Sequence, residues 1–163
     1  MRWLAVIGHL VFAWLVQVLL FNNLHFMGIC FPYVYITALI CMPVLPRWSE
    51  LLIGALIGVL MDLSCSSAGM HTAACVLLMG LRPVLLEHLV QDYERLTSGV
   101  VAATIGISQF VRLAVILCLL HHAVVFAMDA WSISLIGMTA LRWAVSVAFS
   151  LLVILGYGLL RKP

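Results

Sequence analysis

Charged residues are scarce in this sequence. Lys and Arg together number 8 and Asp and Glu 6 among 163 residues, a charged share of 9%. Because a soluble globular domain carries roughly a quarter charged residues, this composition excludes that class. The net charge of +2 also argues against a basic surface that binds nucleic acid. With 66% hydrophobic residues and a mean hydropathy of +1.23, we expect an integral membrane protein.

The usual spacings of metal-binding residues are also missing. No two cysteines form a C-x-x-C pair, and no two histidines lie four residues apart on one predicted helix. We therefore expect no metal site and no cofactor, and we interpret both residue types as core or interfacial. The residues concerned are Cys30, Cys41, Cys65, Cys75 and Cys118, with His9, His25, His71, His88, His121 and His122.

Long apolar runs divide the chain into six segments, and we interpret each as a helix that spans the membrane. The predicted fold class is all-α, a single transmembrane bundle that covers residues 1–163. The first segment lacks an A-x-A site after it, so we expect an anchor rather than a cleaved signal peptide. The segments are Trp3 to Phe21, Phe31 to Leu45, Glu50 to Leu63, Met70 to about Leu89, Gly99 to about Leu120, and one from between Ile133 and Met138 to near Leu160.

The basic residues between these segments predict the orientation of the chain. Lys and Arg tend to stay on the cytoplasmic side of a membrane. Here they lie at both termini and after the second and fourth segments, which predicts cytoplasmic termini. Arg82 lies near the inner end of the fourth segment, where we expect it to reach the interface, and Pro83 is expected to kink that helix. The inner basic residues are Arg2, Arg47, Arg95, Arg161 and Lys162.

Three charged residues are predicted to lie inside the membrane at a similar depth: Asp62, Arg112 and Arg142. A charge at the centre of a membrane helix costs about 2.5 to 3.5 kcal/mol on insertion scales, so such residues usually find partners. We therefore predict that Asp62 pairs with Arg112 or Arg142. The alternative is that each arginine extends to the outer interface, while Asp62 caps a helix end beside the S-C-S-S segment that follows it.

The residues around Asp62 favour a helix that breaks and packs closely. Ser64, Ser66, Ser67 and Gly69 interrupt the apolar run, and irregular backbone at membrane depth must be shielded by protein or by a water-filled cavity. Gly54 and Gly58 precede Asp62 at intervals of four residues, a spacing that lets another helix approach. The lone glycine spacing is a common feature of membrane helices and predicts packing rather than chemistry.

These residues resemble the rod-shape-determining protein family MreD. The resemblance covers Gly54, Gly58, Asp62 and Leu63, the G-M-H-x-A-A run from Gly69 through His71 to Ala74, and the pair Arg82 and Pro83. A later stretch, His121 and His122 with Phe126, Asp129 and Ser132, is similar to a segment of some members. The chain departs from the family's commoner D-L-x-S-G form, because Cys65 stands in the Ser place and Ser66 in the Gly place.

The resemblance implies a scaffold without catalytic activity in the bacterial cytoplasmic membrane. Its expected partner is MreC and, through MreC, the cytoskeletal MreB, a RodA-type glycosyltransferase and its transpeptidase. The implied fold is similar to that of the substrate-binding subunits of energy-coupling-factor transporters.

Two other functions are compatible with parts of the pattern. In a small-molecule binding subunit of a transporter, Asp62, Arg112 and Arg142 would line a polar cavity. In an intramembrane aspartyl enzyme of the lipoprotein signal peptidase type, Asp62 and Asp129 would form an acid pair. We disfavour the enzyme, because Asp129 falls in the loop after the fifth segment and an arginine beside Asp62 would oppose proton sharing.

Overall fold

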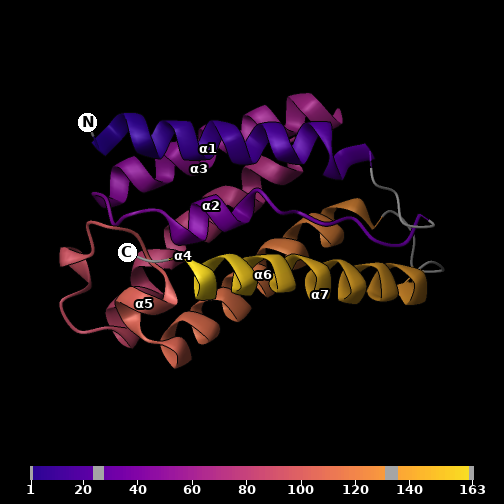
Figure 1. The fold of residues 1–163 in the computed structure, drawn as a ribbon. Helices are drawn as coiled ribbons and strands as arrows, with labels where there is room; N and C mark the ends of the chain where they lie inside the picture. The colour runs from indigo at the N-terminus through magenta and orange to yellow at the C-terminus, as the bar shows by residue number, and fades with distance from the viewer. Residues whose placement is uncertain (1, 24–27, 131–135, 162–163) are drawn as a thin grey trace.

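The computed structural model describes residues 2–23, 28–130 and 136–161, and all of its helices lie in one bundle (Figure 1). The all-α prediction is therefore confirmed for these residues. The α-helices are α1 Arg2–Leu19, α2 Ile36–Cys41, α3 Arg47–Cys65, α4 Met70–Leu89, α5 Ala102–Ile105, α6 Ile107–Asp129 and α7 Ile136–Leu160, with short 3-10 turns η1 Phe21–Asn23 and η2 Tyr93–Arg95.

Five helices of the described residues are long and apolar enough to cross a membrane: α1 with η1, α3, α4, α6 and α7. Their outward faces carry large apolar side chains, such as Phe12 on α1 and Leu56 on α3, which are 66% and 65% exposed. Lipid is the solvent that suits such a surface. The chain is thus an integral multi-pass membrane protein. The predicted start of the last segment near Ile133 lies outside the described residues.

The second predicted spanning helix is wrong. Of the segment from Phe31 to Leu45, only α2 is helical, and all of its residues are buried. The rest of the segment is extended or irregular, yet it runs along the length of the bundle between α1 and α7 (Figure 1). Helix α2 packs against α1, α4, α6 and α7, so this interrupted crossing occupies the centre of the fold.

Polar side chains from neighbouring helices satisfy the non-helical backbone at one end of this crossing. The Gln17 amide nitrogen donates to the Pro32 carbonyl at 2.9 Å, and the Gln17 amide oxygen accepts from the backbone N–H of Val34 at 2.7 Å. The hydroxyl oxygens of Ser146 and Ser150 on α7 accept from the N–H groups of Phe31 and Tyr33. Since unsatisfied backbone groups cannot be tolerated in lipid, these side chains permit the interruption.

The fifth predicted segment is also divided. Residues 99–106 form the short helix α5 and a turn at Gly106, whose φ of +89° favours glycine. Helix α6 begins only at Ile107 and continues to Asp129, nine residues beyond the predicted end at Leu120. Each residue of α6 therefore lies closer to the start of its helix than it would in one continuous helix that starts at Gly99.

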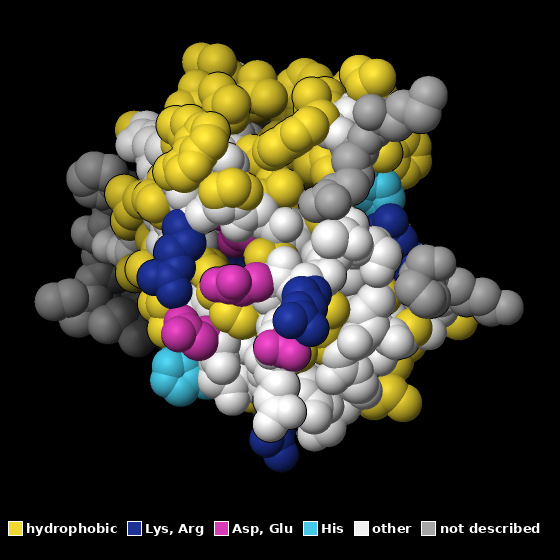
Figure 2. Space-filling view, turned by 90° about the vertical axis from the view of Figure 1, so that its left-hand side faces the viewer, with side chains coloured by type: hydrophobic (Ala, Val, Ile, Leu, Met, Phe, Trp, Pro, Cys, Tyr) yellow, Lys and Arg dark blue, Asp and Glu magenta, His cyan; other side chains and the backbone are white. Residues whose placement is uncertain are grey.

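Both termini lie at the same end of the bundle (Figure 1). Seen from that end, acidic and basic side chains lie close together across the face, and hydrophobic side chains gather toward α1 and α3 (Figure 2). Two of the ion pairs are exposed, Arg47 with Glu87 and Arg95 with Asp92. The termini and the basic residues therefore share one end of the bundle, as predicted. That this end faces the cytoplasm remains a prediction. Lys162 lies outside the described residues.

Candidate functional site

Asp62 caps the start of α4. Its Oδ1 accepts hydrogen bonds from Ser67 Oγ at 2.6 Å and from His71 N at 3.0 Å. Its Oδ2 accepts from Thr72 N at 3.0 Å and Thr72 Oγ1 at 2.6 Å. The carboxylate thus satisfies two backbone N–H groups at the positive end of α4. In the described part of the chain no ion pair joins it to an arginine. The predicted pairing is wrong, and the structure contains the capping alternative.

Replacing Asp62 with alanine is expected to lower the free energy of unfolding by about 2 kcal/mol, the upper range for a lost helix cap. Unfolding in mixed micelles, followed by tryptophan fluorescence, measures this change. Glu87→Ala is the control, because the Glu87 side chain is 56% exposed and its loss should cost much less. A double variant that exchanges the charges of Asp62 and Arg142 should not recover stability. Recovery would contradict the capping role.

The two predicted packing glycines do lie at a close contact between α3 and α4. A Cβ on Gly54 would come within 2.9 Å of the Cys75 carbonyl oxygen. A Cβ on Gly58 would overlap the backbone of Thr72 and lie 2.9 Å from the His71 carbonyl oxygen. Only glycine at these positions allows the backbones to approach so closely, as the spacing predicted.

The turn between α3 and α4 contains two left-handed residues. Ser66 ends α3 with φ +54° and ψ +35°, and Gly69 precedes α4 with φ +85°. Glycine is the residue that usually takes the first of these positions, and a serine there costs roughly 1 kcal/mol. Ser66, which stands in the Gly place of the D-L-x-S-G pattern, therefore adopts a conformation that glycine takes at lower cost. Leu63 is 76% exposed and points away from the bundle.

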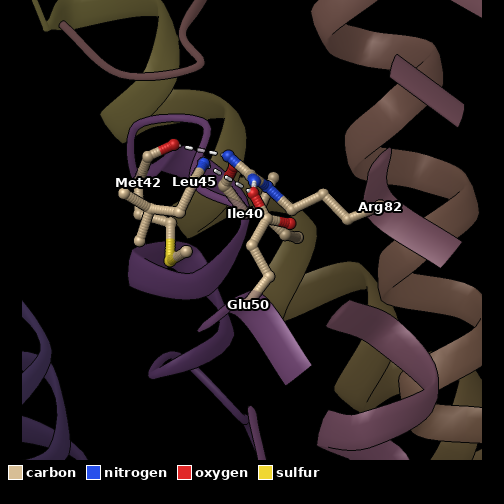
Figure 3. A network of polar contacts seen from close by, with 5 residues as sticks. All are labelled: Ile40, Met42, Leu45, Glu50 and Arg82. Atoms are coloured by element: carbon tan, nitrogen blue, oxygen red, sulfur yellow. Dashed lines mark hydrogen bonds and ion pairs between the residues drawn. The ribbon is translucent and has the colours of Figure 1, made fainter. Parts of the chain in front are cut away.

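Arg82 is completely buried, so its predicted position at the interface is wrong. Its polar contacts with Glu50, Ile40 and Met42 are drawn in Figure 3. Its Nη1 lies 2.6 Å from Glu50 Oε1, and both side chains have zero exposure. Its Nε donates to the Ile40 carbonyl at 3.1 Å, and its Nη2 donates to the Met42 carbonyl. Glu50 Oε1 also accepts from the backbone N–H of Leu45 at 3.1 Å.

This pair stabilises the second end of the interrupted crossing. Met42 ends α2 in an extended conformation, so the carbonyls near this helix end lack helical partners. The Arg82 guanidinium has five donors in a planar fork, so it can bind two carbonyl oxygens and the Glu50 carboxylate at once. A lysine ammonium does not have this geometry. Arg82 and the neighbouring Pro83, also buried within a continuous α4, therefore belong to the core. Glu50 Oε2 has no hydrogen-bond partner within the described residues.

The remaining predicted charges, Arg112 and Arg142, do not meet Asp62. Because α6 starts at Ile107, Arg112 lies only about 7.5 Å along that helix, on its exposed side. The matched depth expected from Gly99 is therefore wrong for Arg112. The guanidinium carbon of Arg142 lies over the Phe31 ring, 5.9 Å from its centroid. Arg142 Nε is buried without a hydrogen-bond partner in the described part of the chain.

A cavity of about 670 Å³ lies at the end of the bundle opposite the termini, and we call it the outer cavity. It is formed where α1, α3 and α6 end and α4 begins. Its lining combines aromatic rings with hydroxyl, amide, thiol and carboxylate groups. The lining includes Leu19, Tyr33, Ser64, His71, Phe126 and Asp129.

A buried cluster of histidine and tyrosine rings lies next to the outer cavity, and two of its members, Tyr33 and His71, line the cavity. Tyr35 Oη lies 2.7 Å from His121 Nε2 and 3.3 Å from His71 Nδ1. The Tyr33 ring packs edge-on against His71 and His121, with centroids 5.0 and 5.7 Å apart. His122 contacts Ser150 Oγ through Nε2 at 3.1 Å. The histidines are thus core residues that connect the cavity to the second crossing and to α7.

The described histidines, cysteines and acids do not gather in any group of three or more suited to a metal ion. The cysteines Cys30, Cys41, Cys65, Cys75 and Cys118 are all free thiols. Cys65 is exposed and accepts a hydrogen bond from the Asn22 amide at 3.2 Å.

The sequence holds one signal for the buried ion pair that the prediction missed. Glu50 and Arg82 lie sixteen residues before and after Ser66, so an antiparallel hairpin that turns at Ser66 places them at the same level. The outer cavity has no comparable signal, because its walls come from four separate helices.

Comparison of the chain with protein-family models, with curated proteins and with solved structures finds no match.

Proposed function

We propose that this protein is a non-enzymatic scaffold subunit of the bacterial cell-wall elongation complex, as the resemblance to MreD implies. One observation carries the proposal: the first stretch of the resemblance, from Gly54 to Pro83, builds the α3–α4 hairpin. Gly58 permits the close approach, Asp62 caps α4 at His71, and Arg82 holds the second crossing through Glu50. Contacts that fix the hairpin pre-organise the helix surfaces around it, which lowers the cost of binding a partner.

The proposed partners follow from the same resemblance. MreC would bind the bundle within the bacterial cytoplasmic membrane, and through MreC the subunit would associate with MreB, a RodA-type glycosyltransferase and its transpeptidase. Both termini would face the cytoplasm, since the charged end of the bundle carries Arg47, Arg95 and Arg161. The similarity to energy-coupling-factor binding subunits belongs to this proposal as well.

The outer cavity favours a second candidate, a small-molecule binding subunit of a membrane transporter. A volume of about 670 Å³ is within the range of known ligand sites, roughly 300 to 1,000 Å³. Unlike the predicted cavity, it is lined by neither Arg112 nor Arg142, and Asp62 lies beside it, behind Ser67.

Affinity purification from native membranes separates the two functions. The tagged protein is extracted in mild detergent, and the proteins recovered with it are identified by mass spectrometry. We expect enrichment of MreC and wall-synthesis enzymes over an unrelated tagged multi-pass protein. The Gly58→Leu variant, which opens the hairpin, should recover less MreC at equal expression. Recovery of an ATPase pair with a transmembrane coupling subunit, and no MreC, would overturn the scaffold proposal.

A further inference from the structure

Helix ends give the outer cavity a negative potential. The carboxyl-terminal ends of α1, α3 and α6 all contribute to its walls, through Leu19, Cys65 and Asp129. Each such end carries the partial negative charge of its helix dipole, and at α1 the Asn23 amide donates to the last carbonyls, those of Val18 and Leu19. Helix α4 contributes the opposite, positive end, but Asp62 caps it. The sum of these dipoles therefore favours a cation inside the cavity.

Side-chain charges act in the same direction. Asp129 lines the cavity as the last residue of α6, where the helix end is already negative. An acid at this position is destabilising by itself, and a bound cation would relieve the repulsion. The Asp62 carboxylate lies behind Ser67 and accepts only from neutral donors, so the partial charge at the start of α4 offsets only part of its negative charge. Among the described residues that line the cavity there is no Lys or Arg.

Aromatic rings determine which kind of cation suits the site. The rings of Tyr33 and Phe126 form adjacent walls, with centroids 6.4 Å apart and planes inclined by 53°. Phe126 and Asp129 lie three residues apart on α6 and so share a helix face. At the same end of the bundle, the Arg142 guanidinium carbon lies over the Phe31 ring, 5.9 Å from the ring centroid, in a cation–π contact. Aromatic rings and a carboxylate that line one cavity are the groups that bind organic ammonium ions.

We propose that the outer cavity binds an organic ammonium group, held by Asp129 and by the rings of Tyr33 and Phe126. The volume of about 670 Å³ leaves room for the remainder of a larger molecule, either a free amine or the ammonium headgroup of a phospholipid. A metal ion fits less well, because the described residues offer no cluster of three ligands. The proposal does not depend on MreC, so failure to bind an amine leaves the scaffold function intact.

Choline is the probe for the free-amine form, and dimethylbutanol, which has the same shape without the charge, is its control. Binding to the purified protein is followed by tryptophan fluorescence, because Trp14 Nε1 donates to Ser64 on the cavity wall at 3.3 Å. Calorimetry provides a second readout. We expect choline to bind about tenfold or more tightly than dimethylbutanol, in line with the strength of cation–π contacts at a desolvated site.

Matched substitutions locate the binding site. Asp129→Asn should weaken choline binding about tenfold, and Phe126→Leu about fivefold, the range expected for a lost charge or ring contact. Asp92→Asn and Phe12→Leu make the same changes at exposed positions away from the cavity and should leave the affinity unchanged. Asp129→Glu should restore most of the binding. Unfolding curves of each variant establish that the bundle is intact.

Lipid composition distinguishes the two sources of the ammonium group. The protein is reconstituted in nanodiscs of phosphatidylethanolamine or of phosphatidylglycerol. If the headgroup occupies the site, choline binds more weakly in phosphatidylethanolamine, and Asp129→Asn abolishes this difference. If a free amine is the ligand, the affinity for choline is equal in both. Equal affinity for choline and dimethylbutanol, or no binding of choline in phosphatidylglycerol, would overturn the proposal.

Discussion

Replacing Arg82 with leucine is expected to lower the free energy of unfolding by about 3 to 5 kcal/mol, the cost of breaking a buried ion pair by removing one partner. The substitution leaves the buried Glu50 carboxylate without its counterion and the carbonyls of Ile40 and Met42 without a donor. Unfolding in mixed micelles measures the change. Arg82→Lys keeps the charge but not the fork, so it should recover only part of the loss.

A matched substitution at the charged end of the bundle provides the control. Arg47 pairs with Glu87 at 3.1 Å, but the two side chains are 64% and 56% exposed. Arg47→Leu should therefore cost no more than about 1 kcal/mol. The double variant Arg82→Leu with Glu50→Leu should cost less than the sum of the single changes, since the two groups act together. An Arg82→Leu protein as stable as Arg47→Leu would contradict the proposed role of the pair.

The long apolar runs correctly predicted the membrane class and five of the helices. In each of these helices the backbone hydrogen bonds form within the run itself, so the local sequence is enough to indicate the structure. The segment from Phe31 to Leu45 has a similar composition but a different structure. Its backbone partners include Gln17 before it in the chain and Ser146, more than a hundred residues after it. Local periodicity contains no information about such distant hydrogen bonds. The interrupted crossing is therefore a tertiary feature that single-sequence reasoning does not detect.

The charges were harder to place than the helices for a related reason. Counting residues from assumed segment ends put Asp62, Arg112 and Arg142 at one depth, and an error in one start displaced Arg112. The assumption that a buried charge needs an opposite charge also failed for Asp62, because backbone N–H groups and hydroxyls satisfy it. Arg82 shows the converse case, in which carbonyls of a broken segment accept from a buried cation.

Substitution of Gly58 should have the second large effect. A Cβ at this position would overlap the Thr72 backbone and lie 2.9 Å from the His71 carbonyl oxygen. No rotamer change removes that collision, so α3 and α4 must move apart. Asp62 would then lose its bonds to the first turn of α4. We expect Gly58→Ala to cost about 3 kcal/mol, the upper range for an overpacked contact, and Gly58→Leu to cost more.

Glycines elsewhere in the helices test whether this effect comes from the contact or from helix propensity. A Cβ on Gly8 of α1 meets nothing within 4 Å, so Gly8→Ala should be neutral or stabilising by up to about 1 kcal/mol. Gly80→Ala is an intermediate control, since its nearest atom is a Leu51 methyl at 3.6 Å. Opposite signs at Gly58 and Gly8, measured in the same micelles, would establish that close approach of α3 and α4 holds the hairpin. Equal effects at the two sites would refute it, because propensity alone treats both glycines alike.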